Sequence, residues 1–237
     1  MSVPNLGSGT PAAVSLGKRE VIVTTCGNVL AAEDGSVLAE GLWKNAFGAT
    51  GPIVNGNVVF QEVGGRIVAV ELSVNEEGGV AFRKKWEQAV RAESCIPGCG
   101  SQFCSHVAHK PIPDDKILRT PIIAPPVCHK QRIYAAEEGG FLWVLDAANG
   151  KVLYSDSPFP MDRREPRIYV WNALTIAGDH LFMFDRGDRG DRALVLEHTP
   201  KVKLTACNPT PAVAGAPAFA GKRMVIHTRW GLCCLAP

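Results

Sequence analysis

The chain carries no strong charge of either sign. Its 237 residues include 25 Lys and Arg against 23 Asp and Glu, which gives a formal net charge of +2. No Lys/Arg tract or basic helix appears along the sequence. Proteins that bind nucleic acid usually show a basic patch or stripe. We therefore expect no nucleic-acid partner.

Long apolar runs are missing as well. A helix that spans a bilayer needs about 20 consecutive apolar residues, and no run in this chain approaches that length. Residues 1–17 also lack the basic start and apolar centre of a secretory signal. We expect no transmembrane segment and, from the sequence as written, no export signal.

The chain also lacks the common catalytic patterns. It has no Gly-rich phosphate loop of the form G-x-x-x-x-G-K-[ST]. No Ser/His/Asp constellation can be proposed from spacing, and His180, His198 and His227 each stand singly in or beside a strand. No residue is predicted to be catalytic.

The chain is rich in turn residues and contains internal repeats. It contains 24 Gly and 17 Pro in a composition that is 46% hydrophobic, as a turn-rich β protein with a core requires. A polar turn followed by a short β-rich run occurs five times, with turn residues at 17, 56, 130, 178 and 221. The steps are 39, 74, 48 and 43 residues. Three of them match the roughly 40–50 residues of a propeller blade, and the long one is a blade plus an insertion.

Each repeat contains further strand signals after its first turn. Gly64-Gly65 and Gly139-Gly140 each lead into a buried strand that ends in a carboxylate, and a third strand such as residues 152–154 follows. This order is one antiparallel blade, nominally of four strands. We predict an all-β fold, a β-propeller of about five blades over residues 1–237, in a ring that need not be complete. Open edges of such a ring would favour self-association.

The long step contains an insertion, predicted over residues 87–119 as a loop excursion too short for a core of its own. Phe82, Trp86 and Val90 are spaced at i, i+4 and i+8, which predicts a short helix at its start.

The insertion is rich in residues that can bind metal or form disulfides. Three soft ligands and two imidazoles would suffice for a tetrahedral zinc site, although the spacing matches no standard zinc motif. Disulfides and unpaired cysteines remain equally open, because the redox compartment decides between them. The candidate residues are Cys95, Cys99, Cys104, His106 and His109, with Cys128 and His129 just beyond.

Other conspicuous residues have structural interpretations. The two Arg-Gly-Asp triplets within residues 185–192 fall where a solvated hairpin between two strands is expected. Trp43, Trp86 and Tyr154 follow strand signals and are expected to pack between blades, and Trp230 is given a related role.

Residues 144–154 (Val-Leu-Asp-Ala-Ala-Asn-Gly-Lys-Val-Leu-Tyr) resemble the repeat of pyrroloquinoline-quinone-type propellers. That repeat has Thr where Asn149 stands and Trp where Tyr154 stands. The other four repeats match it more loosely, and residues 219–235 resemble a closing blade. The resemblance implies the propeller fold and an extracytoplasmic, for instance periplasmic, setting.

This family contains both quinone-dependent dehydrogenases, which bind the quinone with calcium, and scaffolds without a cofactor. The dehydrogenases have a disulfide between adjacent cysteines over the quinone, which the resemblance would assign to Cys233 and Cys234. Neighbouring side chains of a strand point to opposite faces, so two free cysteines are favoured here. The family's Glu, Asn and Asp metal set has no match in this chain.

The sequence therefore favours a non-catalytic binding or assembly scaffold for a protein partner or small ligand, with no cofactor expected. One alternative is a fragment of a quinone-dependent dehydrogenase, with quinone and calcium. The other is a metal-binding module, with zinc, built from the Cys/His residues between 95 and 129.

Overall fold

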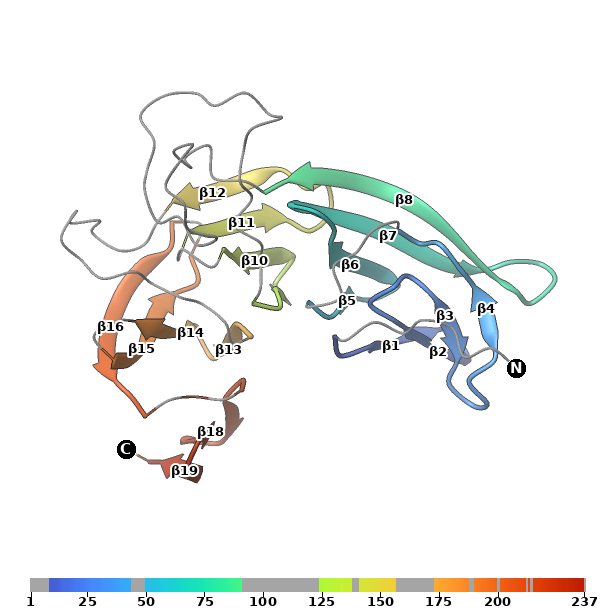
Figure 1. Cartoon of the computed structure of the whole chain (residues 1–237). Coiled ribbons are helices and arrows are strands. Elements are labelled where there is room, and N and C mark those ends of the chain that lie inside the picture. The colour runs from blue at the N-terminus through green and yellow to red at the C-terminus, as the bar shows by residue number, and fades with distance from the viewer. Residues whose placement is uncertain are drawn as a thin grey trace, which may run out of the picture. The chain divides into compact units, whose positions relative to one another are not determined.

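A computed structural model describes residues 9–43, 50–90, 124–137, 141–156, 173–187, 190–199, 201–211, 213 and 215–236. Over these residues every regular element is a β-strand, and the strands form five separate antiparallel sheets (Figure 1). Four sheets have four strands and the fifth has three. The predicted all-β propeller of about five blades is confirmed at this level.

The strands of each sheet follow one another in chain order. The first sheet contains β1 (Ala12–Leu16), β2 (Arg19–Val23), β3 (Val29–Ala31) and β4 (Val37–Ala39), and the second contains β5 (Ile53–Asn55), β6 (Val58–Glu62), β7 (Arg66–Val74) and β8 (Val80–Ala89). The third contains β9 (Val127–His129), β10 (Arg132–Ala136), β11 (Leu142–Asp146) and β12 (Val152–Asp156). The fourth contains β13 (Thr175–Ala177), β14 (His180–Gly187), β15 (Gly190–Glu197) and β16 (Lys203–Pro209), and the fifth contains β17 (Ala218–Ala220), β18 (Arg223–Thr228) and β19 (Gly231–Leu235).

The five turn signals of the sequence are the first hairpin of each sheet. Four of these hairpins have Gly at the first loop position, at residues 17, 56, 178 and 221, with φ between 58° and 67°. The third hairpin places Lys130 (φ 46°) and Gln131 (φ 60°) in the left-handed region instead. Two residues with positive φ are typical of the type I′ hairpin turn, which Asn-Gly fits best. The third turn is therefore formed at a steric cost that the other four avoid.

The chain divides into two compact units. The first unit holds the first and second sheets together with Lys130–Arg132 and Asp146–Lys151 from two turns of the third sheet. Its core lies between the two sheets, where Val21 and Val23 of β2 share one apolar cluster with Val59 of β6. Trp43 is buried in the same cluster, as expected, and its Nε1 donates to the Thr25 carbonyl (2.8 Å).

The second unit holds the rest of the third sheet and the fourth and fifth sheets. One apolar cluster joins the third and fourth sheets through Tyr134, Leu181 and Met183, with Tyr154 packed against it. Another joins the fourth and fifth sheets through Phe184 and Ile226. Each core is thus formed by side chains from facing sheets.

The helix predicted from Phe82, Trp86 and Val90 is wrong. These residues lie in or beside β8, a ten-residue outer strand that pairs with β7 and continues to Ala89, three residues into the expected insertion. Lys84 pairs with Val70 and Trp86 with Ala69, so Lys85 is the extra residue of a β-bulge. Residues four apart share a face in a regular strand, but the bulge turns Phe82 and Trp86 to opposite faces. The remainder of the insertion lies outside the described residues.

A bulge at this place recurs in each four-stranded sheet. The register between the third and fourth strands shifts at Val29/Leu30, Ala69/Val70, Val144/Leu145 and Val195/Leu196. The extra residues on the outer strands are Leu38, Lys85, Leu153 and Thr205. The bulge on the fourth strand is therefore part of the structural repeat, like the strands themselves.

The third turn provides a test of the turn chemistry. Replacing Lys130 with Asn, which tolerates positive φ, should raise the free energy of unfolding by about 0.5–1 kcal/mol. Replacing Gly56 with Ala should lower it by about 1 kcal/mol, because the left-handed backbone then carries a Cβ. Urea denaturation measures both changes, and equal signs for the two variants would contradict this account.

Candidate functional site

Only two residues of the predicted Cys/His cluster lie in the described part of the chain. Cys95, Cys99, Cys104, His106 and His109 lie outside the described residues, whereas Cys128 and His129 lie in β9. Burial raises the pKa of the Cys128 thiol to about 11, so the thiol is protonated at neutral pH. Within the described part of the chain, no group of three or more His, Cys, Asp or Glu could hold a metal ion.

The sequence suggested that His198 stands alone, but in the structure it contacts a second histidine. Its ring contacts the ring of His129 edge to face, with centroids 5.0 Å apart and an interplanar angle of 80°. Its Nε2 lies 3.2 Å from the Gly178 carbonyl and 3.7 Å from a carboxylate oxygen of Asp179. The Tyr134 hydroxyl donates to the His198 carbonyl (2.9 Å). The two histidines are far apart in sequence, and only the stacking of the third and fourth sheets brings them together.

Two buried carboxylates stabilise hairpins. Glu62, at the end of β6, accepts a hydrogen bond from the backbone N–H of Gly65 (2.6 Å). Glu137, directly after β10, accepts one from the indole Nε1 of Trp143 (2.9 Å). Both acids therefore serve the turn between the second and third strands of their sheets. A carboxylate at the end of a β run, just before a glycine-rich turn, is the sequence signal for this role.

The adjacent cysteines behave as strand residues. Cys233 is half-buried and packs against the cluster around Ile226, whereas Cys234 is exposed on the other face of β19, and both are free thiols. The preference for two free cysteines is confirmed.

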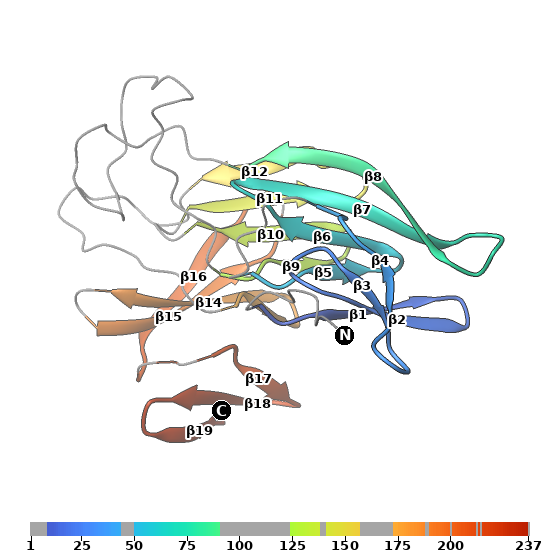
Figure 2. The same ribbon diagram turned by 45° about the vertical axis from the view of Figure 1, so that its right-hand side comes forward.

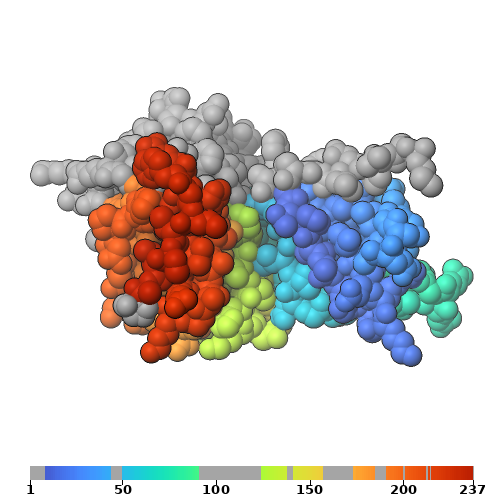
Figure 3. Space-filling model, turned by 90° about the horizontal axis from the view of Figure 1, so that it is seen from below, coloured from blue at the N-terminus to red at the C-terminus, as the bar shows by residue number. Residues whose placement is uncertain are grey.

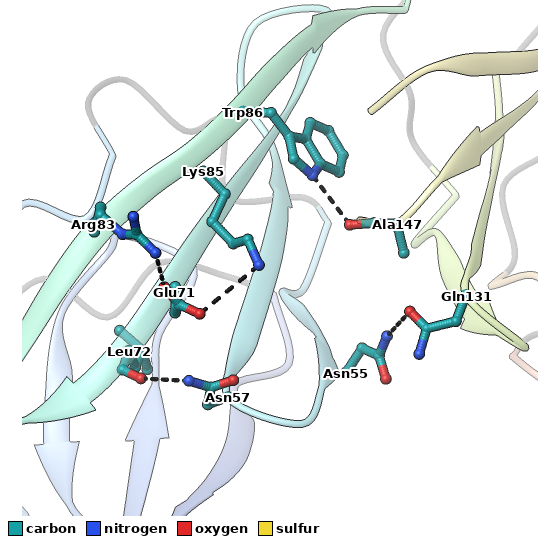
Figure 4. A network of polar contacts seen from close by, with 9 residues as sticks. All are labelled: Asn55, Asn57, Glu71, Leu72, Arg83, Lys85, Trp86, Gln131 and Ala147. Carbon is teal, nitrogen blue, oxygen red and sulfur yellow. Dashed lines mark hydrogen bonds and ion pairs between the residues drawn. The ribbon is translucent and has the colours of Figure 1, made fainter. Parts of the chain in front are cut away.

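The most extensive polar network lies in the first unit, around β8 (Figure 4). The indole Nε1 of Trp86 donates to the Ala147 carbonyl (3.1 Å), and the Asn55 side chain donates to Oε1 of Gln131 (3.0 Å). Gly150 lies under the indole, where a Cβ would come within 2.6 Å of the ring. Trp86 thus packs on the next turn of the repeat, as expected for this aromatic.

The same strand carries ion pairs. Glu71 accepts from Arg83 (2.5 Å) and lies 3.8 Å from the Lys85 ammonium, while Glu87 pairs with Lys84 (3.0 Å) and with Arg66. The hydrogen bond from Arg83 lowers the pKa of Glu71 below its ordinary 4.5. Hydrogen bonds from Arg66 and Lys84 lower the pKa of Glu87 in the same way.

Apolar side chains are exposed on the hairpin that these strands form. β7 and β8 extend well past their neighbours in the first unit (Figure 2). Toward the tip, Val74 is 45% exposed and Phe82 is 42% exposed, on the same face of the hairpin. Glu76 and Glu77 lie in the tip itself, whose turn is closed by a bond from the Gly79 N–H to the Asn75 side chain (2.6 Å). We call Val74, Phe82 and these flanking charges the second-sheet hairpin surface.

Two remaining expectations have opposite outcomes. The hairpin expected at the Arg-Gly-Asp triplets is confirmed, because β14 and β15 pair as far as Gly187 and Gly190. The packing role given to Trp230 is wrong, since its side chain is 71% exposed and stacks with Arg229, whose guanidinium carbon lies 4.1 Å from the ring centroid.

Known structures of similar fold are propellers. The chain is similar to the periplasmic gluconolactonase PpgL of Pseudomonas aeruginosa, with 14% identity and a TM-score of 0.52 over 95% of this chain and 62% of that one. It is also similar to BamB of Moraxella catarrhalis (15% identity, TM-score 0.49, 94% of this chain and 67% of that one) and to a quinohemoprotein alcohol dehydrogenase of Comamonas testosteroni (12%, 0.49, 74% and 28%). No family model and no curated protein sequence matches the chain.

The fold is a β-propeller, as the repeats of the sequence indicated. Identity this low shows the fold alone, and a fold of this kind carries many functions. The chain spans less than two thirds of the length of PpgL and under a third of that dehydrogenase. Among the described residues, no helix has the length and apolarity to cross a bilayer.

The contact of Trp86 with Gly150 predicts a large effect of a single methyl group. Gly150 and Gly35 both have left-handed backbones (φ 75° and 72°), but nothing lies within 4 Å of a Cβ at Gly35. Gly35→Ala should therefore cost only the backbone strain, about 1 kcal/mol. Gly150→Ala should cost a further 1–3 kcal/mol or so because the indole must move. Chemical denaturation compares the two, and equal losses would show that the indole contact is unimportant.

The ion pairs predict a pH dependence. A carboxylate whose folded pKa is lowered stabilises the fold above its unfolded pKa and loses that effect as pH falls through the folded value. Glu71→Gln should therefore weaken the protein at neutral pH, and the deficit relative to wild type should shrink below about pH 4 and in high salt. Denaturation midpoints across pH measure this. Glu76→Gln, in the hairpin tip, is the control and should show no such trend.

Proposed function

We propose that the chain is a non-catalytic propeller scaffold that binds a protein partner through the second-sheet hairpin surface. The main observation in support of this proposal is the exposure of the Val74 and Phe82 side chains on the β7–β8 hairpin. An apolar centre inside a charged rim is the usual composition of a protein interface, and large aromatic side chains supply much of its binding energy.

The polar network supports this role because it fixes the base of the hairpin. Trp86 joins β8 to the turn at Ala147, and the ion pairs of Glu71 and Glu87 join β7 to β8. A surface that is already ordered loses less conformational entropy on binding. Rigid elements that present exposed side chains are suited to recognition more than to chemistry.

An extracytoplasmic setting is part of the proposal. It rests on the resemblance of the repeat and on the likeness in fold to a periplasmic protein. In such an oxidising space the cysteines of the insertion could form disulfides. Cys95, Cys99, Cys104, His106 and His109 remain a proposed disulfide or zinc site, and metal analysis of the purified protein with thiol counting distinguishes the two.

Site-specific photo-crosslinking tests the scaffold function. A photoreactive residue in place of Phe82 should give one discrete cross-linked species in the cells that make the protein. The matched control is the same residue in place of Leu153, which is 38% exposed and apolar but lies on β12 of the third sheet. Val74→Asp should abolish the product at position 82 while the circular-dichroism spectrum is unchanged. Equal products from both positions, or none, would contradict the proposal.

Reconstitution separates the scaffold from the dehydrogenase. The scaffold proposal predicts that pyrroloquinoline quinone with calcium leaves no bound chromophore after gel filtration and gives no alcohol oxidation. A stoichiometric chromophore that resists removal would favour the dehydrogenase instead.

A further inference from the structure

The first sheet is too short to cover the end of the β7–β8 hairpin. β7 has nine residues and β8 has ten, whereas β3 and β4 have three each. Figure 3 shows the blue-green end of the hairpin projecting beyond the blue residues of the first sheet. Val74 pairs with Val80 and Phe82 with Leu72, two members of the core cluster that the two sheets share. The exposure of Val74 and Phe82 therefore follows from unequal strand lengths within one compact unit.

The tip of the hairpin is held in place. The Arg19 guanidinium, at the start of β2, donates a hydrogen bond to the Gly78 carbonyl. Within the tip, the backbone N–H of Asn75 donates to the Gly79 carbonyl (2.9 Å), and the Gly79 N–H donates to the Asn75 side chain. A partner that recognises the two exposed apolar side chains therefore does not have to order the hairpin first.

The two strands carry more cations than carboxylates. The four cations are Arg66, Arg83, Lys84 and Lys85, and the two carboxylates are Glu71 and Glu87. Each carboxylate pairs with two of these cations. The strands therefore have an excess of two positive charges. Two of the cationic side chains are largely exposed, Arg83 at 76% and Lys84 at 61%.

Lys84 lies beside the apolar centre of the surface. It pairs with Val70 as Phe82 pairs with Leu72, so Phe82 and Lys84 are on the same face of the hairpin. Residues two apart in a strand are about 7 Å apart. One extended segment of a partner is long enough to contact both side chains.

The tip has the opposite charge. Glu76 and Glu77 are exposed there, and Lys84 lies on the other side of the apolar pair. An anionic membrane surface would attract the basic strands but repel this acidic tip. A protein segment, in contrast, can match both signs along its length.

We propose that the partner binds the second-sheet hairpin surface through an acidic segment, which places an Asp or Glu side chain beside Lys84 and an apolar side chain against Phe82. This inference rests on the proposed function, because it names the chemistry of the partner. The apolar contact supplies affinity, and the carboxylate selects segments of one charge. Glu87 lies 3.0 Å from the Lys84 ammonium, so it competes with the partner's carboxylate for this cation.

Photo-crosslinking at position 82, followed by mass spectrometry, tests the proposal. The peptide joined to the photoreactive residue should come from a protein and should contain Asp or Glu within about three residues of the joined position. Lys84→Gln should lower the yield of the product about two- to five-fold, because the cation is lost. Glu87→Gln should raise the yield by a similar factor, because the competing carboxylate is lost. All yields are normalised to the amount of folded protein.

The two variants distinguish recognition from stability. Both break the Lys84–Glu87 ion pair, so a purely structural role of this pair predicts changes of the same sign. Lys222→Gln, an exposed lysine in the first turn of the fifth sheet, is the control and should leave the yield unchanged.

The possible failures are distinct. A discrete protein product would leave the scaffold proposal standing but overturn the acidic segment if the joined peptide lacks Asp and Glu. The same holds if Lys84→Gln and Glu87→Gln change the yield in the same direction or not at all. A lipid joined at position 82, or no product, would overturn both proposals.

Discussion

The alternation of side chains along the second strand of each sheet is the constraint on which the rest of the structure depends. A short four-stranded sheet cannot bury its apolar face alone, so each must stack on its neighbours. The stacking requires apolar side chains on both faces of the interior sheets, as in the Leu181, Phe182, Met183 and Phe184 run of β14.

This constraint explains how much of the fold could be predicted. Gly17, Gly56, Gly178 and Gly221 were reliable because a two-residue hairpin with positive φ selects glycine. The strand that follows each turn was predictable because each contains a run of two to four apolar residues. β8 was harder to predict, since its charged side chains are exposed and a bulge breaks the period of two.

The site could be predicted far less well than the fold. The contact of His129 with His198 and the placement of Gly150 under Trp86 join residues from different repeats, and local patterns contain no information on such pairs. The roles of Glu62 and Glu137 were easier to predict from the sequence, because each ends a β run before a glycine-rich turn. A buried carboxylate there accepts hydrogen bonds that stabilise the hairpin. Burial distinguishes a reactive acid from a structural one only once its partners are known.

The bulge on the fourth strand of each four-stranded sheet has a consequence for how this protein avoids misassembly. An outer strand presents a row of backbone N–H and C=O groups that can template the addition of foreign strands and lead to amyloid-like aggregates. One extra residue in β4, β8, β12 and β16 breaks that row into two short segments with different phase. These edges are therefore poor templates for added strands. The irregularity that obscured β8 in the sequence is also a protection against aggregation.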